Sequence, residues 1–121
     1  DFANTLDTDL NFIKDATLDA ATEVEAVTQF IIEQAAENVD FPNAAAVDYL
    51  HAVGLLSFAY MFAKIAAAAK DKSGDFYQNK LALAQYFVDR ILPELDSRLA
   101  KIKAGSDLIM NFSEDYFTNQ A

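Results

Sequence analysis

Apolar residues recur at steps of three and four along almost all of this chain, and no stretch keeps the alternation of a half-buried strand. Residues that interrupt helices are scarce, with 3 Gly and 2 Pro among 121 residues. A chain patterned in this way buries its apolar side chains by packing helices on one another. The sequence therefore predicts an all-α protein, and its length predicts one helical-bundle domain over residues 1–121.

Two long helices are expected in the first half of the chain. The first follows an apolar stripe from Phe2 to Ala35, ends before Pro42, and carries capping residues that allow a break at 15–17. The second begins with Asn43 as its cap and continues to about residue 70.

A polar turn at 70–74 leads to a third long helix, whose seam runs in steps of three and four from Tyr77 to Ile102. Pro93 lies inside this helix and predicts a kink rather than an end. A short last helix is expected over 107–112. Because the connections are short, consecutive helices should be antiparallel, as an up-and-down bundle that resembles a four-helix bundle.

The second predicted helix is apolar on all faces between residues 52 and 69, where only Ser57 and Lys64 interrupt it. A membrane span is one interpretation, and a buried central helix is the other. The apolar run before Lys64 is about 12 residues long, whereas a bilayer needs about 20. We therefore expect a buried helix, in which small residues such as Gly54 let neighbouring helices approach closely.

Acidic residues dominate the charge, which is formally −10 at pH 7. Almost all of it belongs to residues 1–40, which hold 10 acidic groups and 1 basic group. Such a chain repels phosphate backbones and anionic lipid, so we expect neither nucleic acid nor a membrane as partner. The chain has no cysteine, which excludes disulfides and thiolate chemistry but does not fix the compartment. We expect a cytoplasmic protein.

Candidate ligands for a metal are few. Asp48 and His51 stand one helical turn apart, but a di-metal helical bundle needs two Glu-x-x-His motifs, and this chain has one histidine. An acidic row at steps of four could bind calcium or take part in acid–base chemistry, but a solvated helix face explains it better because no calcium-loop spacing frames it. The row comprises Asp15, Asp19 and Glu23, with Glu33 and Glu37 repeating the spacing.

Aromatic residues are numerous, with 10 Phe and 5 Tyr. Those of the second and third helices could line a flat cofactor pocket, but aromatics at helical spacing more often form a core. Phe41, Tyr116 and Phe117 fall in a predicted loop or tail, where they would mark a docking surface. The residues of the pocket hypothesis are Phe58, Tyr60, Phe62, Phe76, Tyr77, Tyr86 and Phe87.

A motif run joins aromatic, lysine and proline positions at fixed spacing over about residues 40–117. It comprises Tyr49-Leu50-x-x-x-Gly54, then Phe76-Tyr77-x-x-Lys80-Leu81-x-x-Ala84-x-Tyr86-Phe87, then Leu92-Pro93 and Ile102-x-x-Gly105. The run resembles the C-terminal helical domain of acyl-CoA dehydrogenases, in the branch that includes methylthiopropanoyl-CoA dehydrogenase-like enzymes.

This resemblance implies a parent oxidoreductase that uses FAD, a flavoprotein of fatty acid metabolism that introduces an α,β double bond into an acyl-CoA. In that family the flavin site and the catalytic glutamate lie upstream of this domain, so no catalytic, cofactor-binding or metal-binding residue is assigned here. The expected partners are the upstream dehydrogenase domains and a second subunit. Together with Asp1 in place of an initiator Met, the resemblance indicates a non-catalytic C-terminal fragment that packs on the enzyme, contacts a subunit or covers the substrate channel.

From the residues alone, the alternative is a free-standing acidic bundle that binds a basic protein partner through its first helix. In both hypotheses Lys80, beside an aromatic pair, has a structural role in a cation–π or carboxylate contact.

Overall fold

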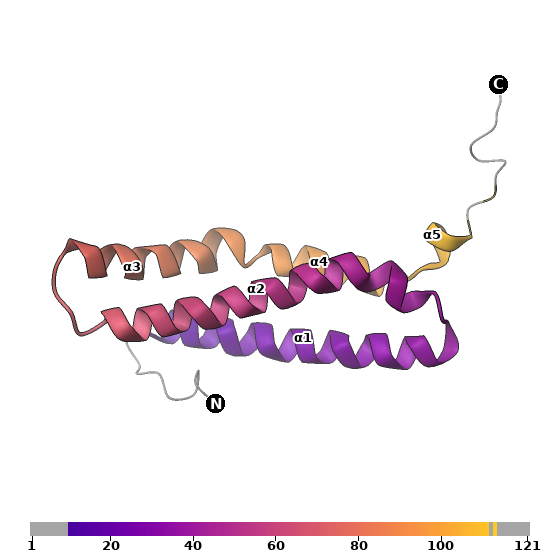
Figure 1. The fold of residues 1–121 in the computed structure, drawn as a ribbon, viewed down its shortest axis with the longest axis horizontal. Coiled ribbons are helices and arrows are strands. Elements are labelled where there is room, and N and C mark those ends of the chain that lie inside the picture. Colours follow the sequence, from indigo (N-terminus) through magenta and orange to yellow (C-terminus); the bar gives the residue numbers. More distant parts are fainter. Residues whose placement is uncertain (1–9, 112, 114–121) are drawn as a thin grey trace, which may run out of the picture.

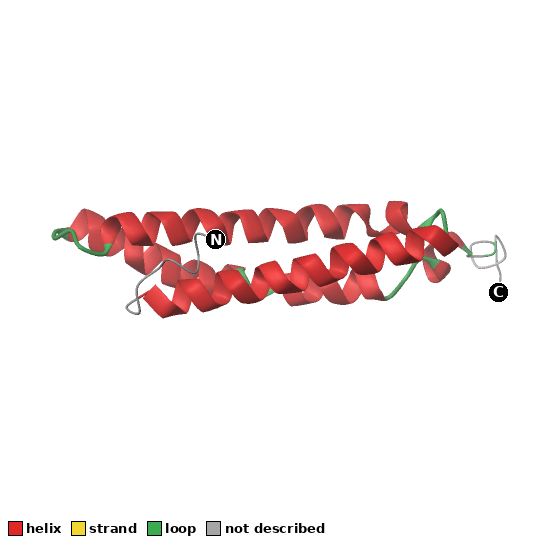
Figure 2. Cartoon of the chain, turned by 90° about the horizontal axis from the view of Figure 1, so that it is seen from below, coloured by secondary structure: helices red, strands yellow, loops and turns green. Residues whose placement is uncertain are grey.

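Three long helices lie side by side along a common axis in the computed structural model, which describes residues 10–111 and 113 (Figures 1 and 2). Every regular element of this part of the chain is helical, and the third long helix is bent, which confirms the predicted helical bundle. The elements are α1 (Asn11–Glu37), α2 (Phe41–Ala69), α3 (Asp75–Tyr86), the π-helical turn η3 (Phe87–Ile91), α4 (Glu94–Lys103) and α5 (Asp107–Met110).

Helix α1 runs without interruption through residues 15–17, so the break that the capping residues allowed does not occur. Thr17 lies inside the bundle, and its hydroxyl donates a 2.6 Å hydrogen bond to the carbonyl oxygen of Ile13 one turn earlier. The Thr17 hydroxyl therefore finds its acceptor within the helix, and this residue does not end the helix. The part of the predicted stripe at Phe2 and Leu6 lies outside the described residues.

Helix α2 begins at Phe41, two residues before the predicted cap at Asn43. Pro42 fits there because the first-turn N–H groups of a helix have no intrahelical acceptor. Phe41 is buried at 3% exposure and meets Phe30 edge to face, with ring centroids 5.6 Å apart. The prediction that Phe41 lies in a loop and marks a docking surface was therefore wrong, while Tyr116 and Phe117 lie outside the described residues.

Pro93 bends the third long helix, as predicted, but the bend includes a π-helical turn that the sequence analysis did not foresee (Figure 1). The backbone N–H of Leu92 bonds the carbonyl oxygen of Phe87 at 2.8 Å, five residues back instead of four. Such a turn inserts one extra residue into the helix. The buried positions accordingly step by five from Phe87 to Leu92, whereas Ile91, which the predicted seam placed inside, is 39% exposed.

Alanines allow α2 to pack closely against its neighbours. Helix α1 contributes Ile13, Val24 and Val27 to the interior, and α4 contributes Leu95, Leu99 and Ile102. Between them lie the small side chains of α2, of which Ala52, Ala59, Ala63 and Ala66 are fully buried.

Burial covers only one side of α2. The helix is long and apolar enough to cross a membrane by length and composition, and 33% of that window is buried inside the bundle. The expectation of a buried central helix was therefore right for the inner face and wrong for the outer face, because three helices leave one side of α2 open.

Candidate functional site

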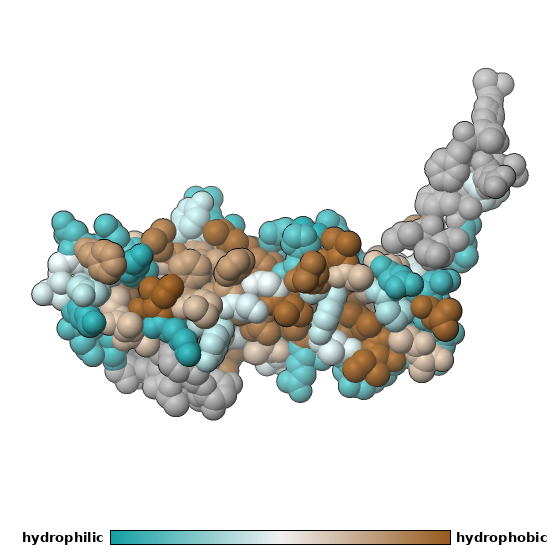
Figure 3. Space-filling view, viewed as in Figure 1, coloured by the Kyte–Doolittle hydropathy of each residue, from teal (hydrophilic) through white to brown (hydrophobic). Residues whose placement is uncertain are grey.

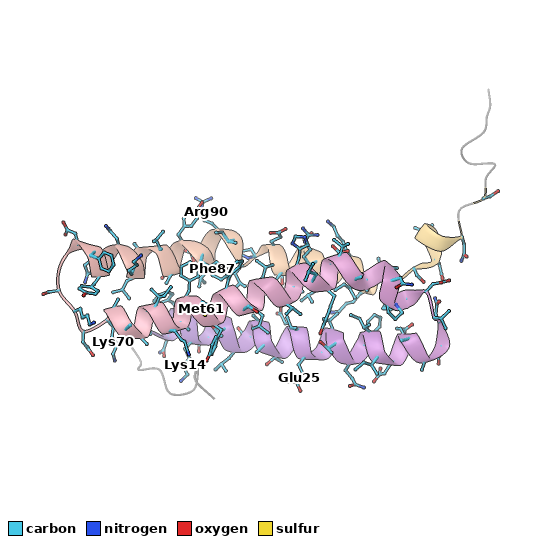
Figure 4. The ribbon with its side chains drawn as sticks, in the orientation of Figure 1. Lys14, Glu25, Met61, Lys70, Phe87 and Arg90 are labelled. Atoms are coloured by element: carbon cyan, nitrogen blue, oxygen red, sulfur yellow. The ribbon has the colours of Figure 1, made fainter. Side chains whose placement is uncertain are left out.

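An exposed apolar stripe runs along α2. We call it the outer stripe; Figure 3 shows brown, apolar side chains interleaved with paler and teal ones on the face that α2 forms. Met61 lies in the part of it that is nearer to Lys70 (Figure 4). Val47, Phe58 and Met61 are 64%, 59% and 52% exposed. The outer stripe consists of Val47, His51, Gly54, Phe58, Met61, Ile65 and Ala68.

The aromatic residues do not gather into one flat pocket. Phe87 alone of the seven is fully buried, where Phe62 stacks on it at a centroid distance of 4.9 Å and Phe58 meets it edge to face at 6.5 Å. Four of the others are exposed, so these aromatics are only in part the predicted core. The exposed four are Phe58, Tyr60, Phe76 and Tyr86.

Two side chains of the motif run, Lys80 and Tyr49, make polar contacts. The ammonium of Lys80 lies 5.0 Å from the ring centroid of Phe76, which confirms the predicted cation–π contact. The Tyr49 hydroxyl, for which burial would require a partner, is 2.7 Å from the hydroxyl of Thr28. Both contacts join side chains for packing, and Thr28 and Tyr49 also line a mostly apolar hollow of about 240 Å³ between α1 and α2.

Asp48 and His51 do not act together. The Asp48 carboxylate accepts a 2.9 Å hydrogen bond from Arg98 of α4, while His51 is exposed on the outer stripe. Hydrogen bonds to Asp48 and then Glu94 raise the pKa of Arg98. Within residues 10–111 and 113, no three His, Asp or Glu side chains are placed to hold a metal ion.

The acidic row of α1 borders a shallow groove of about 230 Å³ between α1 and the bend of the third helix. Asp19 and Glu23 line one side of this groove, and Asp96 of α4 lines the other. The sequence analysis placed the row on a solvated face, and Asp15, Asp19 and Glu23 are exposed. It missed Asp96, because only the fold, in which α4 runs antiparallel to α2 and in the same direction as α1, brings that carboxylate beside α1. Binding of a basic partner by this row stays a prediction.

The groove raises the pKa of Glu23 above its ordinary value of 4.5. Partial burial is the largest cause, followed by the negative charges of Asp96 and Asp19, while Lys103 acts in the opposite direction. A carboxyl whose pKa is raised on folding destabilises the folded state when it is ionised, and this penalty disappears once the pH falls below the ordinary pKa.

Replacing Glu23 by glutamine should therefore raise the free energy of unfolding at pH 7, by at most about 0.5 kcal/mol because water screens this exposed site. The gain should disappear near pH 4, where wild-type Glu23 also becomes protonated. Urea denaturation at both pH values measures the difference. Glu25→Gln, at a side chain that points away from the bundle in Figure 4, is the control, and an equal gain there would contradict the assigned cause.

The described surface thus offers an open acidic groove and a long exposed apolar stripe, both of which could contact another molecular surface.

A family model described as acetyl-CoA dehydrogenase C-terminal like matches residues 1–113. No curated protein and no solved structure matches the chain.

Proposed function

This chain belongs to the acetyl-CoA dehydrogenase C-terminal-like family, and on that premise we propose that it is a non-catalytic domain of an acyl-CoA dehydrogenase. The parent enzyme would use FAD to introduce an α,β double bond into an acyl-CoA. The domain itself would supply contact surface, either to the dehydrogenase body, to a second subunit, or over the substrate channel.

The outer stripe is the observation that carries this proposal. Soluble monomers rarely expose contiguous apolar patches of more than a few hundred Å², and larger ones mark interaction sites. The stripe runs from Val47 to Ala68, which spans about 30 Å at 1.5 Å per residue. Side chains such as Val47 and Met61 contribute little to the bundle's own core, so burying them against another surface suits a domain that makes contacts.

The residues of the acidic groove do not fit the flavin cofactor. A flavin dinucleotide carries an anionic pyrophosphate, which proteins bind with backbone N–H groups and cations. Asp19, Glu23 and Asp96 would repel it. This groove therefore supports placing the flavin site elsewhere in the parent enzyme.

Flavin binding and turnover test the proposal directly. The purified 121-residue chain is mixed with FAD, desalted and assayed with saturated acyl-CoA esters and an artificial electron-accepting dye. We expect no retained flavin and no reduction of the dye. A dehydrogenase body that carries this domain, assayed in parallel, is the positive control. Retained flavin together with turnover by the chain alone would contradict a non-catalytic role.

A further inference from the structure

The outer stripe has the spacing of a helix–helix seam although it faces solvent. Its positions at 47, 51, 54, 58, 61, 65 and 68 alternate steps of four and three, which is the heptad pattern of two packed helices. The inner face of α2 packs in the bundle through a separate set that includes Ala52, Leu55 and Ala59. Helix α2 therefore carries two seams, of which the described bundle covers one.

Gly54 lies within the outer stripe and has no role in the bundle's own packing. A Cβ atom built there meets no other atom within 4 Å. Its backbone is not in the left-handed region either, since the positive φ values belong to Gly74 and Gly105. Glycine inside a helix is less stable than alanine. A close approach by another helix from outside gives this position a reason to lack a side chain.

We propose that the outer stripe is the interface with a second copy of this chain, with the two α2 helices antiparallel and related by a two-fold axis near Phe58. The stripe is self-complementary in this register. Gly54 faces Met61 of the second copy, and Val47 faces Ala68, so small side chains meet larger ones. A two-fold axis repeats both contacts, as in isologous dimers.

The outer stripe, with Leu50 beside it, supplies apolar area for such a dimer. Its large apolar side chains present roughly 500 Å² per copy, toward the about 800 Å² per partner of a standard interface. These side chains are Val47, Leu50, Phe58, Met61 and Ile65.

The low charge of this face favours it over the rest of the molecule as a dimer interface. Between residues 47 and 68 the formal charges are Asp48, already paired with Arg98, and Lys64. The acidic groove is lined by α1, by Val88 of η3, by the bend at 92–93 and by α4, without any α2 residue, so it lies away from the stripe. Two copies can therefore associate through α2 without bringing their acidic α1 helices together.

The first test is the mass of the 121-residue chain in solution, by analytical ultracentrifugation from 1 to 100 µM. We expect twice the monomer mass of 13.3 kDa at the higher concentrations. Gly54→Leu should raise the dissociation constant of the dimer at least tenfold with unchanged helical content. Leu83→Gln, at an exposed position of α3, is the control and should leave the dimer intact.

The second test maps the register, using a chain that has no cysteine of its own. Ser57→Cys, beside the proposed axis, should form a disulfide-linked dimer on mild oxidation. Ser97→Cys, an equally conservative change at an exposed position of α4, should remain monomeric on a denaturing gel. Equal cross-linking of both variants would contradict the antiparallel register.

Other occupants of the stripe give different results. A monomer at all concentrations, or a dimer unaffected by Gly54→Leu, would overturn the proposal. Flotation of the monomer with phosphatidylcholine vesicles would indicate a membrane instead. The inference rests on the proposed contact role of this domain, but the mass measurement and the flavin assay can fail independently of each other.

Discussion

Replacing Phe87 by alanine should lower the free energy of unfolding by about 3–5 kcal/mol, the largest effect expected for a single substitution here. Phe87 is 2% exposed, stacks on Phe62 and meets Phe58 edge to face. It also lies at the start of the π-helical turn, and its carbonyl oxygen accepts the 2.8 Å hydrogen bond from the N–H of Leu92 that closes this turn. Truncation would leave a cavity that Phe62 and Phe58 cannot fill without leaving their own positions.

Phe76→Ala is the matched control, because the same ring is removed at a position that is 65% exposed. Urea denaturation followed by circular dichroism measures both variants at one protein concentration, since dimer formation would couple unfolding to concentration. The midpoint of the Phe87 variant should fall by 1 M or more at typical urea slopes of about 1–3 kcal/mol/M. Similar losses for the two variants would show that Phe87 does not anchor the bend.

Replacing Ala59 by leucine should destabilise the bundle by about 1–3 kcal/mol through overpacking. Ala59 is fully buried in α2, and its carbonyl oxygen lies 3.5 Å from the hydroxyl of Thr17 in α1. The two helices are thus too close for three added carbon atoms unless one of them moves away. Leucine and alanine are both good helix formers, so helix propensity contributes little to the difference.

Ala82→Leu, at an exposed position of α3, is the control for Ala59→Leu and should leave stability within about 0.5 kcal/mol. Thermal unfolding of both variants checks the prediction. An Ala59 variant as stable as the wild type would mean that α1 and α2 do not approach as closely as the structure shows.

Much of the fold could be predicted because helix formation depends on local spacing. The apolar steps of three and four located α1, α2 and the third long helix, and Pro93 located the bend. The start of α2 was misplaced because the prediction took Pro42 as a helix stop, although proline is also accepted in the first turn. The π-helical turn was missed because no residue pattern in the sequence distinguishes it from an ordinary helical turn.

The candidate site was less predictable, because its residues come together only through packing. The sequence analysis considered Asp48 together with His51 as a pair of metal ligands. The structure instead pairs the Asp48 carboxylate with Arg98, fifty residues later. Glu23 was read as part of a row on one helix, whereas Asp96 of α4 shares its groove. Pairs like these join residues on different helices, so spacing along the sequence does not reveal them.

By itself, the sequence determined that the chain is helical, where its helices lie, and which helix holds most of the acidic charge, since all three follow from local spacing and composition. It could not determine which side of α2 is covered, because that helix is apolar on every side. The tertiary structure decided this point. Two neighbouring helices can cover only part of a third, and the outer stripe from Val47 to Ala68 is the part that they leave exposed.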